Sequence, residues 1–204
     1  MIIPPFYDYA AAVLCGYLMG SAPFGLLLGH AFGVGDLRKI GSGNIGATNM
    51  WRAGRKDLAV LTFALDSTKA AVTLAIARAL FGAEAGFAAG CAAFLGHCFP
   101  IWLRFKGGKG VSSFFGVLLA GMPYVGIAAA LTWLATVFTF RISALGALAA
   151  AALAPLFAYL LHRPLWQVLV CVGLALVIYP LHHANLRRLL KGEEPKLGAG
   201  RASR

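Results

Sequence analysis

Charged side chains are scarce in this sequence. They make up 12% of its 204 residues, while hydrophobic residues make up 60%; an ordinary soluble protein carries roughly 25% charged residues. A soluble fold of this size could not cover its surface with so few charges. The high apolar content also excludes a disordered chain and a collagen-like one. The composition therefore indicates an integral membrane protein.

Acidic residues are scarcer still. Seven Asp and Glu stand against 18 Lys and Arg, which gives a formal net charge of +11. On a soluble chain this excess would suggest a nucleic-acid partner. Here the basic residues lie in short gaps between apolar runs, where membrane topology accounts for most of them. We therefore expect no nucleic-acid partner, and a basic site for an anionic substrate would account for the remaining positive charge.

Cysteine is also rare, and its spacing is not that of a disulfide framework or a metal site. All four cysteines lie in or beside apolar segments, so we interpret them as small buried hydrophobic residues. We expect neither a disulfide nor a bound metal. The four are Cys15, Cys91, Cys98 and Cys171.

Seven apolar runs follow one another along the chain. They cover residues 9–32, 58–80, 85–103, 112–121, 124–140, 143–161 and 165–181. A membrane-spanning helix takes about 20 apolar residues. Because the fourth run is short and Pro123 follows it, runs four and five could form one kinked helix, which makes six spans the alternative. We predict an all-α integral membrane protein with seven transmembrane helices in a single domain over residues 1–204, with a short flexible tail from about residue 195.

The basic residues indicate the orientation of these helices. The gaps at 34–56, 104–110 and 141 and the tail from 183 hold 5, 3, 1 and 6 Lys and Arg residues, fifteen of the eighteen. The alternate gaps hold only Arg78 and Arg163, and Lys69 lies inside a run. Because cytoplasmic loops are enriched in Lys and Arg, we expect the N-terminus outside and the C-terminus in the cytoplasm.

The first unusual polar segment is Gly-Ser-Gly-Asn-Ile-Gly-Ala-Thr-Asn-Met-Trp-Arg, from Gly41 to Arg52. Its glycines allow backbone N–H groups to converge, and its Ser, Thr and Asn side chains add short hydrogen-bonding groups. Such a segment suits an anion, especially a phosphate. The alternative is an ordinary flexible loop between spans.

The second segment runs from His97 to Gly110 and contains Lys106-Gly107-Gly108-Lys109-Gly110 at the start of the fourth run. Backbone amides at a helix N-terminus, together with a nearby ammonium group, form a second place for a phosphate. The alternative is a basic anchor at the membrane surface, which requires the lysines but not the glycines.

The third segment runs from His182 to Glu194. On a helix, His182 and Asn185 share one face near the bilayer surface, and an amide at that depth requires a partner. Arg187, Arg188 and Lys191 instead suit a basic helix against anionic lipid headgroups. The function of Glu194 stays open at this point, as does that of its neighbour Glu193.

Asp66 and Lys69 lie one helical turn apart inside the second run. Charges at that depth are costly and pair with one another or line a cavity. We therefore expect either a self-contained ion pair or a functional group.

Taken together, these segments resemble the bacterial PlsY family, the acyl-phosphate-dependent glycerol-3-phosphate 1-O-acyltransferases. The match covers nearly the whole chain, and the order and sidedness of its pieces make it specific. The pieces are Ser21 to Gly25, Gly41 to Asn49, Asp66 to Lys69, His97 to Pro100, Phe105 to Gly110, His182-x-x-Asn185, Arg188-Leu189-Leu190 and Glu194 to Gly198.

The resemblance implies a seven-helix protein of the bacterial inner membrane with its active site facing the cytoplasm. It also implies the reaction of acyl phosphate with glycerol 3-phosphate, which gives 1-acylglycerol 3-phosphate (a lysophosphatidic acid) and phosphate at the start of phospholipid synthesis. The anhydride is already activated, so we expect no cofactor. The expected partners are the two substrates and membrane lipid, with no obligate protein partner.

By the same resemblance, Ser42, Arg52, Lys109 and Asn185 would bind phosphate and stabilise charge on the attacked carbonyl. His182 would orient a substrate or accept the proton of the glycerol hydroxyl, a role that a substrate phosphate could take instead. Further expected substrate contacts come from the glycines of the two loops, through their amides, and from nearby polar side chains. They are Gly41, Gly43, Asn44, Asn49, Lys106, Gly107, Gly108 and Ser143.

Two other classes of protein fit the sequence less well than this enzyme. A small anion or phosphate transporter would distribute charges across the membrane depth, whereas only Asp66 and Lys69 lie deep in this sequence. A structural subunit that only binds anionic lipid leaves the glycines unexplained. Acyl-thioester chemistry of the soluble type is disfavoured, because that chemistry uses a His with an Asp five positions on, and His30 and Asp36 are six apart.

Overall fold

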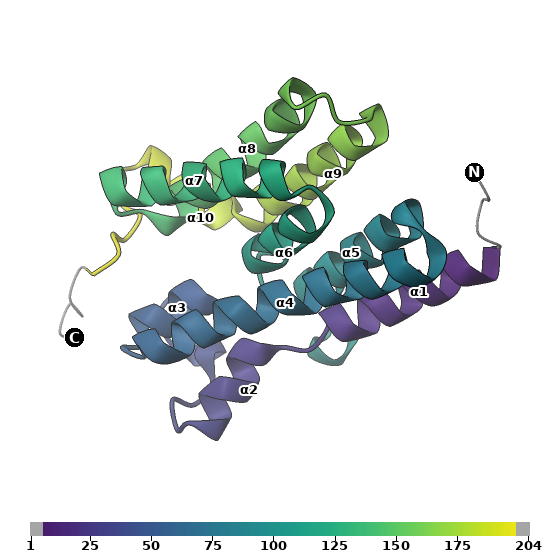
Figure 1. The fold of residues 1–204 in the computed structure, drawn as a ribbon. Coiled ribbons are helices and arrows are strands. Elements are labelled where there is room, and N and C mark those ends of the chain that lie inside the picture. The colour runs from purple at the N-terminus through teal and green to yellow at the C-terminus, as the bar shows by residue number, and fades with distance from the viewer. Residues whose placement is uncertain (1–5, 199–204) are drawn as a thin grey trace. The chain divides into compact units, whose positions relative to one another are not determined.

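The computed structural model describes residues 6–198, which form helices and connections without a strand (Figure 1). The all-helical prediction is confirmed for these residues; residues 199–204 of the predicted tail lie outside them. The chain divides into two compact units, one up to Pro123 and one from Tyr124 onward. The helices of the first unit are α1 (Phe6–Gly20), α2 (Phe24–Ala31), the short 3₁₀ helix η1 (Leu37–Lys39), α3 (Ala47–Arg52), α4 (Lys56–Phe81), α5 (Ala83–Cys98), the 3₁₀ helix η2 (Ile101–Leu103) and α6 (Val111–Gly121).

The first apolar run, predicted as one helix, is broken in two. Helix α1 ends at Gly20 and α2 begins at Phe24, directly after Pro23. Proline has no backbone N–H and disfavours helical geometry in the residue before it, so a continuous helix ends at this point. The break leaves the carbonyl of Ala22 outside both helices, where another group can use it as an acceptor.

Helices α1, α4 and α5 lie side by side in the first unit (Figure 1). Helix α1 approaches α5 through glycines, because a Cβ atom on Gly16 or Gly20 would collide with the backbone of Ala89 or Ala93. Small residues of this kind let helix backbones come close in lipid, where apolar burial alone gives little drive for association.

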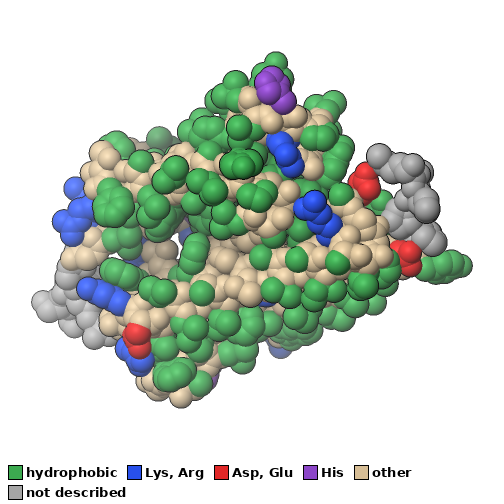
Figure 2. Space-filling model, viewed as in Figure 1, with side chains coloured by type: hydrophobic (Ala, Val, Ile, Leu, Met, Phe, Trp, Pro, Cys, Tyr) green, Lys and Arg blue, Asp and Glu red, His purple; other side chains and the backbone are tan. Residues whose placement is uncertain are grey.

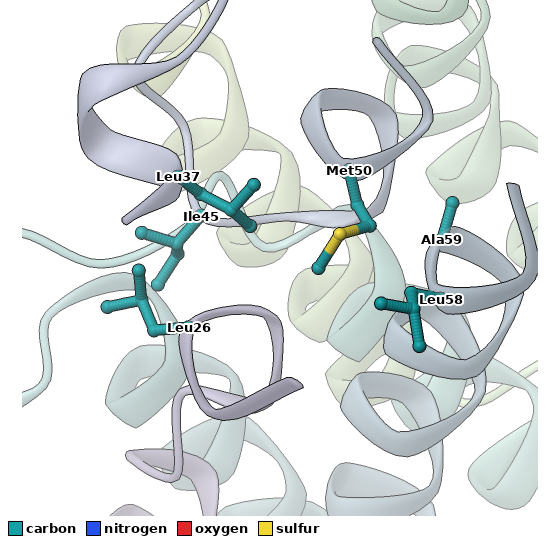
Figure 3. Close-up of a cluster of buried hydrophobic side chains, with 6 residues drawn as sticks. All are labelled: Leu26, Leu37, Ile45, Met50, Leu58 and Ala59. Atoms are coloured by element: carbon teal, nitrogen blue, oxygen red, sulfur yellow. The ribbon is translucent and has the colours of Figure 1, made fainter. Parts of the chain in front are cut away.

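A separate apolar cluster joins α2, η1, α3 and the start of α4 (Figure 3). All its members are at most 6% exposed. Leu103 of η2 packs against the same cluster. The cluster therefore connects the segment that carries the first glycine-rich loop to the segment that carries the second. Its buried members are Leu26, Leu37, Ile45, Met50, Leu58 and Ala59.

The second unit begins one residue into α7 (Pro123–Phe140) and also contains α8 (Ser143–Leu160), α9 (Leu165–Leu181) and α10 (His183–Leu190). Helix α8 packs against α9, and the Tyr179 hydroxyl donates a hydrogen bond of 3.2 Å to the Leu148 carbonyl. The chain turns by 68° between α9 and α10. Beyond α10, the Leu197 N–H donates to the Arg141 carbonyl at 2.6 Å, and the Arg141 guanidinium donates to the Leu197 carbonyl at 3.1 Å. This two-way pairing attaches the segment after α10 to the α7–α8 connection.

Five segments within the described residues are long and apolar enough to cross a membrane, and a sixth is added if the bent α9–α10 pair counts as one. Each of the seven predicted runs contains a helix, but α6 has only 11 residues, about 16 Å of helix against a hydrocarbon core of roughly 30 Å. Large apolar side chains are exposed along the spans, for example Val60, Leu131 and Leu169, and green apolar atoms cover much of the visible surface (Figure 2). These features are those of an integral membrane protein.

Candidate active site

The first glycine-rich loop is built around the side chain of Asn49, which is 1% exposed. Its amide nitrogen lies 3.0, 2.9 and 2.8 Å from the carbonyl oxygens of Leu37, Ile40 and Asn44. Its Oδ1 accepts hydrogen bonds from the Ser42 N–H at 3.0 Å and from the Ser42 hydroxyl at 3.3 Å. Asn49 thus holds the loop on both sides, and its polar atoms are engaged by the loop itself.

Gly41 fits only as glycine. Its φ of +54° lies in the left-handed region, where a Cβ atom is unfavourable. A Cβ atom there would also lie 2.5 Å from Asn49 Oδ1 and 3.9 Å from the Arg52 Cβ. Ser42, which is exposed, and Arg52, at the end of α3, therefore flank the same tight turn.

The acidic residue that precedes this loop is neutralised by a neighbour. The Arg38 side chain donates hydrogen bonds to Asp36 Oδ1 at 2.9 Å and to Oδ2 at 2.8 Å. This pairing lowers the pKa of Asp36 from 3.8 to about 2. Asp36 is therefore a carboxylate at neutral pH, with Arg38 as its counter-ion, so that the pair contributes no net charge beside the loop.

The glycines of the second loop allow close approach to the end of α5. The Gly107 N–H donates to the Cys98 carbonyl and the Gly108 N–H to the His97 carbonyl, both at 3.0 Å. Gly43 of the first loop likewise donates its N–H to the Ile40 carbonyl at 2.9 Å. In this structure these three amides, which the resemblance assigned to the substrates, donate to the chain's own carbonyls.

The second loop leads directly into a helix N-terminus, at the start of α6. This helix begins at Val111, directly after Gly110, whose φ is +81°. The first amides of an α-helix have no partner within the helix, and the helix dipole favours an anion beside them. Lys109, half-buried and one residue before the N-cap, adds a positive charge at this end of α6. Lys106 is exposed in the same loop.

In the second unit, His182 lies in the bend between α9 and α10 and is 3% exposed. Its Nδ1 lies 2.9 Å from the Ile178 carbonyl oxygen. A carbonyl only accepts hydrogen bonds, so Nδ1 carries the ring hydrogen of the neutral imidazole. The proton-accepting nitrogen of His182 is therefore Nε2.

Asn185 and Glu194 form a buried pair that the sequence did not reveal. Asn185 Nδ2 donates to Glu194 Oε1 at 2.8 Å, and Arg188 Nε donates to Glu194 Oε2 at 2.7 Å. Both carboxylate oxygens are thereby used, and the Glu194 side chain is 1% exposed. The one available signal was its place after the basic helix, in a stretch that matched the family resemblance.

The predicted site residues thus form two groups, each within one unit. Ser42, Asn49 and Arg52 surround one turn of the first unit, and Lys106 to Gly110 lead into α6 of the same unit. His182, Asn185 and Ser143, the first residue of α8, belong to the second unit. Asp66 and Lys69 form an ion pair at 2.8 Å, which is one of the two expected alternatives.

Within residues 6–198, no group of three or more His, Cys, Asp and Glu side chains is arranged to hold a metal ion. The four cysteines, all within this range, form no disulfide. The fold and these segments define a helical membrane protein with basic, glycine-containing loops of the kind that bind phosphate groups.

A family model described as glycerol-3-phosphate acyltransferase matches residues 10–192. The chain belongs to the glycerol-3-phosphate acyltransferase family. A protein of that name from Maricaulis maris (strain MCS10) is 55% identical over 189 residues, covering 92% of this chain and 87% of the relative. Another from Jannaschia sp. (strain CCS1) is 52% identical over 185 residues and covers 91% of each chain.

Solved structures agree with this assignment. A crystal structure of PlsY (YgiH), an integral membrane glycerol 3-phosphate acyltransferase, in its glycerol 3-phosphate form matches with a TM-score of 0.88 at 36% identity, covering 93% of this chain and 96% of the other. The lysophosphatidic acid form matches with a TM-score of 0.86 at 35% identity, covering 93% and 95%. The resemblance to the PlsY family stated from the motifs is confirmed.

Proposed function

We propose that this glycerol-3-phosphate acyltransferase takes its acyl group from acyl phosphate and transfers it to glycerol 3-phosphate. The products are 1-acylglycerol 3-phosphate and inorganic phosphate. Family membership supports glycerol 3-phosphate as the acceptor, as do the glycerol 3-phosphate and lysophosphatidic acid forms of the related crystal structures.

One observation carries the choice of donor. The first unit has two basic, glycine-containing segments that pack on one apolar cluster, the first through Ile45 and Met50 and the second through Leu103. A reaction between two phosphorylated substrates requires two places for phosphate. A free fatty acid would leave one of these segments without a phosphate, and a CoA or carrier-protein thioester carries its phosphates at the far end of the pantetheine arm rather than on the reacting carbonyl.

The predicted site residues each have a role in the proposed reaction. Ser42 and Arg52 bind one phosphate, while Lys109 and the first amides of α6 bind the other. Positive charge and N–H groups in these places stabilise the negative charge that develops on the carbonyl oxygen and on the departing phosphate. Asn44, Lys106 and Ser143 contribute further contacts to the substrates. Asn49 and the loop glycines shape the site.

In the chemical step, the glycerol hydroxyl oxygen bonds to the acyl carbonyl carbon, and the bond from that carbon to the phosphate oxygen breaks. The hydroxyl proton leaves to a base, which is either Nε2 of His182 or a phosphate oxygen of the substrate. Asn185, oriented by Glu194, binds the phosphorylated substrate near His182. Phosphate is a good leaving group, so neither a cofactor nor a covalent enzyme intermediate is required.

We place the protein in the bacterial inner membrane as a single catalytic domain with seven spans. Helices α6 and α9 join the five longer candidates to make up this number. The N-terminus faces outward and the basic loops face the cytoplasm, because fifteen of the eighteen Lys and Arg residues fall on that side.

The test is phosphate release by the detergent-purified protein with palmitoyl phosphate, with and without glycerol 3-phosphate, beside a palmitoyl-CoA control. We expect release that requires glycerol 3-phosphate and yields a lysophosphatidic acid. Activity with the CoA thioester alone would overturn the donor assignment. No product with any donor, from a folded sample, would overturn the proposed reaction and favour an assay of phosphate flux in liposomes.

A further inference from the structure

Three ionisable side chains from two helices meet in the interior of the first unit. Lys69 Nζ lies 2.8 Å from Asp66 Oδ1 and 3.1 Å from His97 Nδ1, and His97 Nδ1 lies 3.5 Å from Asp66 Oδ1. All three residues are at most 5% exposed. Burial of charged groups is costly, so their arrangement calls for an explanation beyond the pairing of one Asp with one Lys.

Lys69 Nζ has three polar neighbours. It donates to Asp66 and, at 2.7 Å, to the Ala22 carbonyl, and it lies within hydrogen-bonding distance of His97 Nδ1. That carbonyl lies in the break between α1 and α2. The Lys69 Nζ atom also lies 5.6 Å from the centre of the Phe24 ring. Lys69 therefore connects α4 with the interrupted first run and with the end of α5.

His97 connects this cluster with the second glycine-rich loop. Its backbone carbonyl accepts the hydrogen bond from the Gly108 N–H. A Cβ atom at Gly108 would collide with the His97 ring, and the ring atom closest to it is Nε2. The imidazole thus contacts the loop directly, one residue before Lys109.

The two ring nitrogens of His97 have different surroundings. Nδ1 lies beside Lys69 Nζ and Asp66 Oδ1, and Nε2 is the ring atom nearest to Gly108. The ion pair therefore contacts one edge of the ring, and the other edge faces the loop.

Further hydrogen bonds hold the chain between the end of α5 and the start of α6. The Tyr17 hydroxyl donates to the Phe99 carbonyl at 2.7 Å, and the Trp102 indole donates to the Ser21 carbonyl at 2.8 Å. The Ser113 hydroxyl of α6 donates to the Asp66 carbonyl at 3.0 Å. The start of α6 is therefore attached to the same turn of α4 that carries the charged cluster.

We propose that Asp66, Lys69 and His97 are positioning residues that hold the Lys106–Gly110 loop, and with it Lys109, in the geometry that binds a substrate phosphate. The proposal rests on the proposed function of this loop. A self-contained ion pair would require only Asp66 and Lys69. The imidazole between that pair and Gly108 is what gives the cluster a connection to the site.

The contact between His97 and Gly108 is tested by a double-mutant cycle on melting temperature. We expect Gly108→Ala to lower the melting temperature in the parent, because its Cβ collides with the imidazole. In the His97→Ala background the ring is absent, so Gly108→Ala should lower the melting temperature much less. Equal losses in both backgrounds would overturn the contact.

The positioning role is tested by ligand binding, which does not depend on turnover. Glycerol 3-phosphate and inorganic phosphate are each titrated against melting temperature for the parent, Asp66→Asn/Lys69→Met and His97→Asn. The double variant removes both charges together, and His97→Asn keeps an acceptor near Lys69. We expect folded variants whose apparent affinity for the phosphate ligands falls roughly tenfold, equivalent to about one lost hydrogen bond.

Thr73→Val is the matched control. Thr73 is a buried polar residue of α4 one turn from Lys69, and its hydroxyl donates to the Lys69 carbonyl within the same helix. We expect this variant to bind the ligands as the parent does. Folded Asp66→Asn/Lys69→Met and His97→Asn proteins with parental affinity would overturn the proposal. A parent that binds glycerol 3-phosphate but does not turn over acyl phosphate would instead count against the proposed function alone.

Discussion

Asn185 donates its amide hydrogen to Glu194 across 2.8 Å, and both side chains are buried in the second unit. Because the other carboxylate oxygen accepts from Arg188, the Glu194 carboxylate lies between two donors and uses both of its oxygens. The carboxylate thereby fixes the orientation of the Asn185 amide, with Nδ2 directed at Glu194.

We expect Glu194→Gln to lower kcat/KM by about 10- to 100-fold, the equivalent of one charge-assisted hydrogen bond of 1.5–3 kcal/mol. The new amide would direct an N–H group at one of the two donors. Glu193→Gln is the matched control, because the Glu193 side chain is exposed. Steady-state kinetics of both variants check this, and equal losses would contradict the assigned role of Glu194.

Asn49→Asp should destabilise the first loop. The change replaces an amide nitrogen that faces three carbonyl oxygens by a carboxylate oxygen that repels them. We expect a loss of stability on the order of 3 kcal/mol, as for other buried groups left without their partners. Asn44→Asp, at a half-buried position of the same loop, should lower the free energy of unfolding much less. Thermal unfolding in detergent measures both, and similar melting temperatures for the two variants would refute the prediction.

Gly41→Ala and Gly33→Ala separate backbone strain from crowding. Both positions have positive φ, +54° and +72°, so each alanine carries a backbone cost of about 1–2 kcal/mol. Only Gly41 has atoms within contact of the new Cβ, whereas Gly33 has none within 4 Å. We expect loss of activity for Gly41→Ala and near-parental activity for Gly33→Ala in the phosphate-release assay. Comparable activity in the two variants would show that the turn does not require this packing.

Lys109→Ala should abolish most turnover while the protein stays folded. Loss of one group that stabilises charge in the transition state reduces kcat by about 100-fold or more. Arg187→Ala, an exposed change on α10, should alter the rate by no more than about twofold, as surface substitutions do. Near-parental activity of Lys109→Ala would remove Lys109 from the site, and a complete loss in Arg187→Ala would add Arg187 to it.

The helices were largely predictable because apolar runs specify them directly. Helices α4, α7, α8 and α9 begin and end within two residues of the predicted runs. The break at Pro23 was missed, because one proline inside a long apolar run leaves the overall hydropathy almost unchanged. Its effect is local, through a missing N–H and a ring that clashes with the preceding turn.

The sequence predicted which residues belong to the candidate site better than it predicted what each of them contacts. Glycines and basic residues marked both loops, but sequence alone could not show that the amides of Gly107 and Gly108 donate to the end of α5. Nor could it show that Asn49 turns inward or that Glu194 reaches Asn185. These contacts depend on where the chain folds back, which neither periodicity nor spacing specifies.

Glu194 comes after every helix of the described chain, nine residues beyond the amide that it orients. During synthesis, α10 is therefore complete before the carboxylate that arranges Asn185 has been added. A chain released at the end of α10 would carry every helix of residues 6–190 and still lack this arrangement. The orientation of the Asn185 amide is thus acquired only after the last described helix has been made, so that a copy truncated at that point would have the helical fold without this buried pair.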